Sequence, residues 1–314
     1  MFGLEVINPG LFTLIQDPGR FGVGHLGLSS GGPVDLHAFC WANKLLGNKA
    51  DAACLEIMMG NASFRAMTDI TVALTGADTQ PRIDGYPQPH WRAFNLKQGQ
   101  TLQLGFAQSG LRAYLAVAGG IQAPDFLGSK ATVVRNGLGG LPVLGEKLGT
   151  GNKIQAGDKI PVRHKCKKTH LYSVPKTYIP DYPDTLSVGV IPSYQFDSFS
   201  SSSVEQFFNS EYEITQQSDR MGIRLSGPAI KSKLKGIISE GIAPGSIQIP
   251  ADGQPIVLMN DRQTLGGYPK IGCVTRLAQS KLAQAKPGTT VRFQQAIMKG
   301  ESIKLSAFLR FFNL

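Results

Sequence analysis

Short runs of alternating or β-branched residues recur along most of the chain, and glycine, proline or aspartate ends each of them. Clear examples lie at residues 70–74, 101–104, 114–117 and 256–259. Runs of this length and composition are typical of β-strands. The 37 glycines and 19 prolines supply the turns that many short strands require. The pattern therefore predicts a mainly β protein of the barrel or sandwich class.

Helix signals are few. Pro33 and Asp35 are typical of a helix start, and Gly47 of a helix end, so we expect a helix between them. A second helix is predicted to begin in the serine run at residues 198–203, and a third around residues 307–312. Short helices in a chain of many strands agree with the β class.

A proline-rich segment divides the chain. Pro175, Pro180 and Pro183 fall close together, and such a segment is extended and enters a sheet poorly. Because 314 residues suggest about two domains, we predict an N-terminal domain at residues 1–173, a linker at 174–184 and a C-terminal domain at 185–314.

The two predicted domains share weak similarities in the same order. Residues 20–23 match 220–223, residues 60–64 match 245–249, and residues 99–104 match 288–293. Three matches in one order indicate an internal repeat more strongly than any one of them. We therefore expect a duplicated barrel.

Composition narrows the function classes. The net charge is +10, but the only dense basic run, at residues 163–168, adjoins the linker and is better explained as a solvated segment than as a nucleic-acid site. No apolar run reaches 18 residues and the N-terminus lacks the features of a signal peptide, so we expect neither a membrane span nor export. Four cysteines without paired spacing favour a cytoplasmic location. The excess charge still fits anionic substrates or an acidic partner.

Several common motifs are absent or incomplete. The sequence of residues 22–27 matches the pattern of a dinucleotide-binding fingerprint, but no helix signal follows it directly. We therefore interpret these glycines as turn residues. His164, Cys166 and His170 adjoin lysines and lack a fourth ligand nearby, so no metal site is expected. The sequence around Lys299 departs from a biotin-attachment site, which favours an exposed lysine.

Polar loops that follow strands are the better candidates for chemistry. A first loop offers a guanidinium and backbone N–H groups to a carboxylate or phosphate, and comprises Arg20, Ser30, Gly31, Gly32 and Asp35. Two further loops lie at residues 218–221 and 260–269. In these, Asp261 is a candidate base or orienting group, Arg262 an anion ligand and Tyr268 a donor or stacking group. The alternative is that Asp219 and Asp261 cap turns while the arginines pair with them.

The same loops resemble a known family. RFG at residues 20–22, GGPVD at 31–35, SDRMGIRL at 218–225 and NDRQTLGGY at 260–268 are similar to the biotin-dependent carboxyltransferase family, once called allophanate hydrolase subunit 2. Residues 114–121 and 127–132 match as well, so the resemblance covers nearly the whole chain. It implies two related cyclophilin-like β-barrel domains with a few short helices.

Within that family the chain is similar in particular to the C subunit of prokaryotic 5-oxoprolinase and to KipA-like regulators. The resemblance implies ATP-dependent hydrolysis of 5-oxo-L-proline to L-glutamate, together with a KipI-like B subunit and an A subunit. ATP would be shared with a partner, since no standard phosphate-binding motif is present. Two alternatives stay open: a biotin-dependent carboxyltransferase component of the urea carboxylase type, and a non-catalytic regulator that binds a KipI-like kinase inhibitor. Biotin is expected only under the first alternative.

The matched loops give the predicted site. Asp219 and Asp261 are the predicted catalytic residues. The predicted substrate- or nucleotide-binding residues are Arg20, Ser30, Gly31, Gly32, Asp35, Arg220, Arg262, Thr264, Gly266, Gly267 and Tyr268. We expect these loops from both domains to share one anion-binding crevice.

Overall fold

The computed structural model describes residues 2–143, 146–163 and 170–314. The chain forms two compact units. Unit 1 comprises Met1–Phe21, Gly31–Asp181 and Phe312–Leu314, and unit 2 comprises Gly22–Ser30 and Tyr182–Phe311. The change of unit after Asp181 falls inside the predicted linker, residues 174–184.

The segment Gly22–Ser30 departs from the predicted boundaries, because it lies in unit 2 although it precedes most of unit 1 in sequence. The Ser29 hydroxyl donates to the carbonyl of Arg262 at 2.7 Å, and the Ser30 hydroxyl donates to the carbonyl of Asn260 at 3.4 Å. These hydrogen bonds hold the segment against a loop that is distant in sequence.

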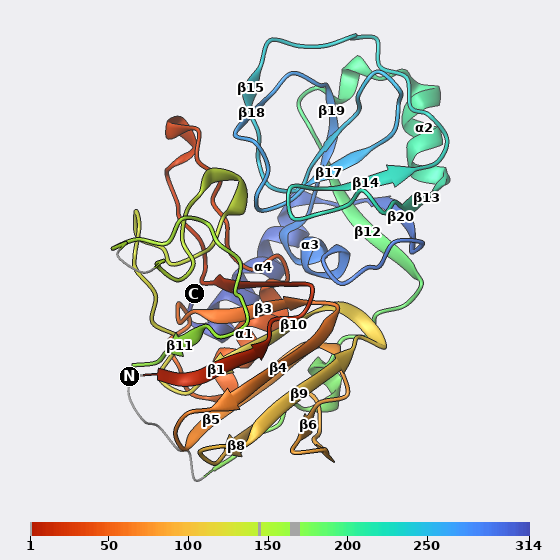
Figure 1. Cartoon of the computed structure of the whole chain (residues 1–314). Coiled ribbons are helices and arrows are strands. Elements are labelled where there is room, and N and C mark those ends of the chain that lie inside the picture. The colour runs from red at the N-terminus through yellow and green to blue at the C-terminus, as the bar shows by residue number, and fades with distance from the viewer. Residues whose placement is uncertain (1, 144–145, 164–169) are drawn as a thin grey trace. The chain divides into compact units, whose positions relative to one another are not determined.

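Two sheets form unit 1 (Figure 1). The six-stranded sheet has the order β11 (Lys159–Pro161), β1 (Phe2–Asn8), β4 (Gly60–Ala66), β9 (Thr101–Phe106), β6 (Arg82–Ile83) and β7 (Tyr86–Pro87). The five-stranded sheet has the order β2 (Phe12–Gln16), β3 (Cys54–Met58), β10 (Ser109–Val117), β5 (Ile70–Asp78) and β8 (Arg92–Leu96). The neighbouring strands in both sheets are antiparallel.

Both sheets contribute to one apolar core. Val6 and Phe64 from the first sheet and Leu55, Leu74 and Leu115 from the second are fully buried in the same cluster. Burial of this much apolar surface is the main stabilising contribution to such a unit.

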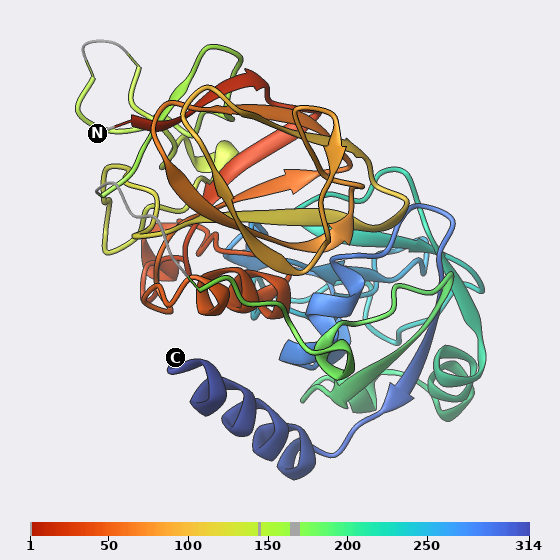
Figure 2. The ribbon, with the colours of Figure 1, turned by 90° about the horizontal axis from the view of Figure 1, so that it is seen from below.

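Helix α1 (Leu36–Leu45) packs on the five-stranded sheet, and so covers the face of β5 and β10 that the core does not use (Figure 2). Asp35 is its N-cap and accepts a hydrogen bond from the Ala38 N–H at 3.0 Å. This contact satisfies one of the donors that a helix start leaves free. The Thr75 hydroxyl of β5 donates to the Ala38 carbonyl at 2.7 Å. The predicted helix between Asp35 and Gly47 is confirmed.

Unit 2 contains a closed barrel (Figure 1). The strand order around it is β12 (Thr185–Pro192), β19 (Lys270–Val274), β16 (Ser246–Gln248), β17 (Ile256–Leu258), β14 (Gly222–Ser226), β13 (Glu211–Ile214) and β20 (Thr290–Gln295). Only β12 and β20 run parallel. Closure gives each strand of the barrel a neighbour on both sides.

Two helices contact the barrel, one at β20 and one at β12. Helix α2 (Ser201–Asn209) begins at Ser200, which caps it, and its Phe207 stacks on Phe293 of β20 at 4.5 Å between ring centroids. Helices α3 (Arg276–Leu282) and α4 (Met298–Phe312) follow later in the chain. The predicted α2 is confirmed, α4 begins earlier than residue 307, and α3 is not predicted by the sequence.

Smaller elements complete the chain. Strands β15 (Glu240–Gly241) and β18 (Leu265–Gly266) form a two-stranded sheet. Single turns of 3₁₀ helix occur at Gly24–Leu26, Val134–Asn136, Lys176–Tyr178 and Phe196–Ser198. None of the helices in the described part of the chain has the length and apolarity that a bilayer crossing requires. The mainly β class is confirmed.

Candidate functional site

A cavity of about 590 Å³ lies in unit 2, beside strands β14, β16 and β17. Its charged and polar lining includes Asp219, Arg224, Gln248, Gln263 and Tyr268. We call it the polar cavity. Two of the predicted site residues, Asp219 and Tyr268, line it, although their loops are distant in sequence.

Asp219 occupies the turn that leads into β14. One of its carboxylate oxygens, Oδ1, accepts hydrogen bonds from the N–H groups of Met221 at 2.7 Å and Gly222 at 3.1 Å. Its side chain therefore caps a turn, as the structural alternative predicts. The residue is also exposed and lines the cavity, so Oδ2 lies beyond the two turn contacts. A carboxylate in this position can accept a proton without loss of the turn.

Asp261 is placed differently. Its carboxylate is buried and accepts two hydrogen bonds from Arg220, Nε to Oδ2 and Nη2 to Oδ1, both at 2.9 Å. Two-point pairing of this kind fixes both side chains. Asp261 and Arg220 thus pair with each other, as the alternative interpretation of these loops expects. Neither residue lines the polar cavity.

Arg262 is tied to backbone carbonyls. Its Nε donates to the Ile242 carbonyl at 2.9 Å and its Nη1 to the Met259 carbonyl at 3.4 Å. Burial, with the nearby Arg276 as a second cause, lowers the pKa of its guanidinium. The backbone carbonyl of Thr264 accepts from the Ile242 N–H at 3.0 Å. These contacts shape the loop after β17 rather than the cavity wall.

The two glycines of that loop allow close packing. A Cβ on Gly266 would lie 2.4 Å from Cδ1 of Ile242 and 2.6 Å from Nε2 of Gln248. A Cβ on Gly267 would lie 3.1 Å from the Ile237 carbonyl oxygen. Gly266 therefore has to lack a side chain for Gln248 to keep its position.

The predicted residues of unit 1 have structural contacts. Arg20 is buried, and its Nη2 donates to the Ala131 carbonyl at 2.7 Å. Gly31 and Gly32 both have positive φ, 65° and 89°, and the Gly32 N–H donates to Oε1 of Gln16 at 3.0 Å. Asp35 caps α1. Ser30 belongs to unit 2 by its bond to Asn260. The crevice shared between the two domains stays a prediction.

A buried polar network next to Asp35 was not predicted. The Tyr114 hydroxyl donates to Oε2 of Glu56 at 2.6 Å and accepts from the Asp35 N–H at 2.9 Å. Oε2 of Glu56 also accepts from the Val34 N–H at 3.1 Å. Burial and the neighbouring Glu56 raise the pKa of the Tyr114 hydroxyl well above its ordinary value. This network fixes the start of α1 on the five-stranded sheet.

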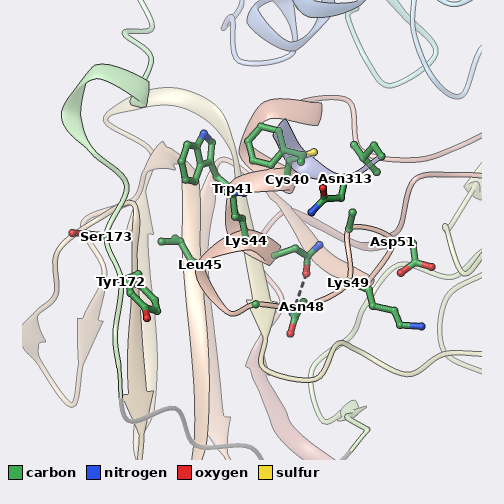
Figure 3. A pocket seen from close by; sticks show the side chains of 15 residues that line it. Cys40, Trp41, Lys44, Leu45, Asn48, Lys49, Asp51, Tyr172, Ser173 and Asn313 are labelled. Atoms are coloured by element: carbon green, nitrogen blue, oxygen red, sulfur yellow. Dashed lines mark hydrogen bonds between the residues drawn. The ribbon is translucent and has the colours of Figure 1, made fainter. Parts of the chain in front are cut away.

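Unit 1 has a larger cavity, of about 980 Å³, near the end of α1 (Figure 3). Trp41, Lys44, Lys49 and Tyr172 line it. The side-chain amide of Asn48 donates to Oδ1 of Asn43 at 3.0 Å and to the Val117 carbonyl at 2.9 Å. The Asn48 amide therefore stabilises local structure. None of the predicted site residues lines this cavity.

Arg224, Gln248 and Gln263 line the polar cavity and are absent from the predicted site. Arg224 has a sequence signal, because it lies in the matched stretch 218–225 and alternates with the buried Ile223 and Leu225 of β14. Gln248 interrupts the apolar residues Ile247 and Ile249, and a polar residue in a buried strand is itself a signal. Together with Asp219 and Tyr268, these groups offer a cation, amides, a carboxylate and a phenol to a small polar ligand.

Metal chemistry has no evident ligand set in the described residues. No group of three histidine, cysteine, aspartate or glutamate side chains there is placed to hold an ion. His164 and Cys166, considered above as weak metal candidates, lie outside the described residues.

Comparison with known proteins gives consistent results. A family model described as carboxyltransferase domain, subdomain A and B, matches residues 26–295. The chain is 37% identical to the C subunit of 5-oxoprolinase from Escherichia coli (strain K12), over 96% of this chain and 93% of that protein. It is 33% identical to the C subunit of 5-oxoprolinase from Haemophilus influenzae, over 96% of this chain and 94% of that protein.

The structure is similar to that of Kluyveromyces lactis urea carboxylase, with a TM-score of 0.91 and 25% identity. This match covers 99% of the chain but only 29% of the urea carboxylase chain. Sequence and structure thus agree over the same extent of the chain. The chain belongs to the family of carboxyltransferase domains built from subdomains A and B.

Proposed function

We propose that this chain is the C subunit of an ATP-dependent 5-oxoprolinase, which hydrolyses 5-oxo-L-proline to L-glutamate. The observation that carries the proposal is the 37% identity to the Escherichia coli protein, which extends over nearly the full length of both chains. An A subunit and a KipI-like B subunit would complete the enzyme, and the complex would work in the cytoplasm.

The polar cavity supports a ligand of this chemistry. 5-Oxoproline has a carboxylate and a lactam amide. Arg224 is exposed on β14, and no carboxylate among the described residues pairs with its side chain, so the guanidinium is available to an anionic ligand. The side-chain amides of Gln248 and Gln263 and the Tyr268 hydroxyl would meet the lactam.

ATP has a definite chemical role in this reaction. A lactam carbonyl is a poor electrophile, and transfer of the γ-phosphoryl group to its oxygen releases ADP and makes the carbon reactive. Water would then add to that carbon, and cleavage of the ring C–N bond would leave the free amine and an acyl phosphate. A second water would hydrolyse the acyl phosphate to give glutamate and inorganic phosphate. Fixed positive charges and amide dipoles around the charge that develops in the transition state lower the activation barrier. ATP would be bound jointly with a partner protein of the complex.

The two predicted catalytic aspartates would have different roles. Asp219, on the cavity wall, would accept the proton of the attacking water. Asp261, paired with Arg220, would position the loop that carries Tyr268. Asp261 is therefore a positioning residue in this proposal.

Reconstitution tests the proposal. The purified A and B subunits with this chain should convert 5-oxo-L-proline and ATP to glutamate, ADP and phosphate. Omission of this chain should abolish the conversion. Equal turnover without it would contradict the proposed function.

A second candidate is a carboxyltransferase component that moves a carboxyl group from biotin to urea. The likeness to Kluyveromyces lactis urea carboxylase favours it. It predicts biotin-dependent carboxylation when a biotinylated carrier and a biotin carboxylase are supplied, and no glutamate from 5-oxoproline. The same reconstitution, run with both substrate sets, separates the two candidates.

A further inference from the structure

Two side chains of the polar cavity, Gln248 and Thr215, each have a buried polar atom without a hydrogen-bond partner in the described part of the chain, and Gln248 is the one that offers an amide donor. Its side chain lines the cavity, yet the residue is only 1% exposed. Among the residues that the structure describes, its buried Nε2 finds no hydrogen-bond acceptor. A buried amide donor without a partner has lost its hydrogen bonds to water and forms none within the protein, which costs free energy. A ligand that accepts a hydrogen bond from Nε2 would offset this cost.

The backbone fixes the position of Gln248. On one side it pairs with Ile256 of β17 and on the other with Lys270 of β19. The register shifts between Ile247 and Gln248 on the β19 side, which marks a bulge or irregularity. Bulges redirect a side chain and are frequent beside active sites.

Gly266 completes the arrangement. Because a Cβ there would lie 2.6 Å from Nε2 of Gln248, the glycine leaves the space that the amide occupies. A neighbour in the same cavity shows the contrast. Gln254 uses its amide fully, since its Oε1 accepts from the Gly227 N–H at 2.9 Å and its Nε2 donates to the Gly227 carbonyl at 3.1 Å. Gln254 thus has a structural partner, whereas Nε2 of Gln248 has none among the described residues.

From these observations we infer that Gln248 recognises a cis-amide, and that cyclic amides and ureas are the ligand class of the polar cavity. The inference deepens the proposed function and rests on it for the identity of 5-oxoproline as the natural lactam. In a lactam the ring holds N–H and C=O on the same side, where one primary carboxamide can meet both with two parallel hydrogen bonds. Open-chain secondary amides are almost always trans and present the two groups on opposite sides.

The orientation of the glutamine amide suits this pairing. The terminal torsion of glutamine is broad and roughly two-fold, so rotation exchanges Oε1 and Nε2 at little cost. Either order of donor and acceptor can therefore meet a ring amide. Arg224, in the wall of the same cavity, would add affinity for a ring that also has a carboxylate.

Direct binding to the full-length chain, without ATP or partner proteins, tests the inference. Calorimetric titration with 5-oxo-L-proline and with N-methyl-5-oxo-L-proline should show at least about tenfold weaker binding of the methylated ring, because methylation removes the N–H. In Gln248→Met, which keeps the side-chain length, affinity for 5-oxo-L-proline should fall by about tenfold or more. The difference between the two ligands should also nearly vanish.

Control variants separate recognition from folding. Gln294→Met changes an exposed glutamine of β20 outside the cavity and should bind 5-oxo-L-proline as the native chain does. Gly266→Ala should weaken binding like Gln248→Met, since its Cβ displaces the amide. Circular dichroism melting verifies that each variant is folded.

The outcomes distinguish this inference from the proposed function. Native affinity in Gln248→Met, an unchanged methylation effect in that variant, or no binding of any lactam by the native chain overturns the inference. Lactam binding that depends on Gln248, together with absent 5-oxoproline turnover in the reconstituted complex, overturns the proposed function but leaves the ligand class in place.

Discussion

Arg220 donates two hydrogen bonds of 2.9 Å to the Asp261 carboxylate, and the Asp261 N–H donates to the Arg220 carbonyl at the same distance. The pair joins the turn before β14 to the loop after β17. A carboxylate held in this way cannot take up a proton without loss of the ion pair. This geometry supports the positioning role proposed for Asp261 and the role in proton transfer proposed for Asp219.

Removal of the Asp261 charge should destabilise unit 2. Loss of one partner of a buried ion pair leaves the other charge unpaired, at a cost of about 3 to 5 kcal/mol. We expect Asp261→Asn to lower the free energy of unfolding by roughly that amount in urea titrations. The exposed pair Arg292–Glu211 gives the control, and Glu211→Gln should change the value by less than about 1 kcal/mol. Equal effects of the two substitutions would refute the structural role of the pair.

Asp219→Asn separates turn capping from chemistry. The asparagine carbonyl can still accept from the Met221 and Gly222 N–H groups, so the melting temperature should stay close to native. The variant cannot act as a base, and turnover in the reconstituted enzyme should fall by about 10² to 10⁴. Native turnover in a stable variant would remove Asp219 from the catalytic residues. A regulator that only sequesters a partner would show no such loss.

Arg224→Met tests the binding of an anionic ligand. Because the guanidinium is exposed and lines the polar cavity, its removal should leave stability within about 0.5 kcal/mol of native. KM for 5-oxo-L-proline should rise about tenfold or more, with a smaller change in kcat. Affinity for 2-pyrrolidinone, which has no carboxylate, should not change. If both ligands weaken equally, Arg224 does not bind the carboxylate.

His37 on α1 should make unit 1 sensitive to acid. Burial lowers the pKa of His37 to about 4 from 6.5, and its Nε2 accepts from Nε1 of Trp41 at 3.2 Å. Because the pKa of His37 is lower in the folded state than in the unfolded state, the neutral side chain contributes its full stabilisation of the folded state above pH 6.5. This stabilisation is lost as the pH falls from 6.5 towards 4. His37→Gln keeps an acceptor but does not titrate. Its unfolding free energy should therefore drop by roughly 2 kcal/mol less than that of the native chain between about pH 7 and 4.5. Parallel pH profiles for the two proteins would contradict this assignment.

Local signals predicted the local structure well. The N-cap at Asp35 and the serine run before α2 are confirmed, because capping depends on residues within one turn of each other. The turn glycines before matched strands also agree, since Gly99 and Gly288 have φ of 89° and 91°. Helix α3 was missed, as its seven residues follow a threonine without a strong start signal.

The pairing of segments that are distant in sequence was harder to predict from the sequence. Strand β4 lies beside β9, whereas their proposed counterparts β16 and β20 are not neighbours in the barrel. The attachment of Gly22–Ser30 to unit 2 depends on hydrogen bonds that span 233 and 230 positions of the chain. No pattern within a short window encodes such a contact.

The order of residues by itself determined the β class, the helix caps and the loops that carry the family likeness, because each of these follows from neighbours along the chain. Tertiary structure alone decided which of those loops line a cavity. It paired Asp261 with Arg220, left Asp219 facing the cavity and placed Gln248 against Gly266. The physical reason is that burial and hydrogen-bond satisfaction depend on everything within a few ångströms, and most of those neighbours come from remote parts of the sequence.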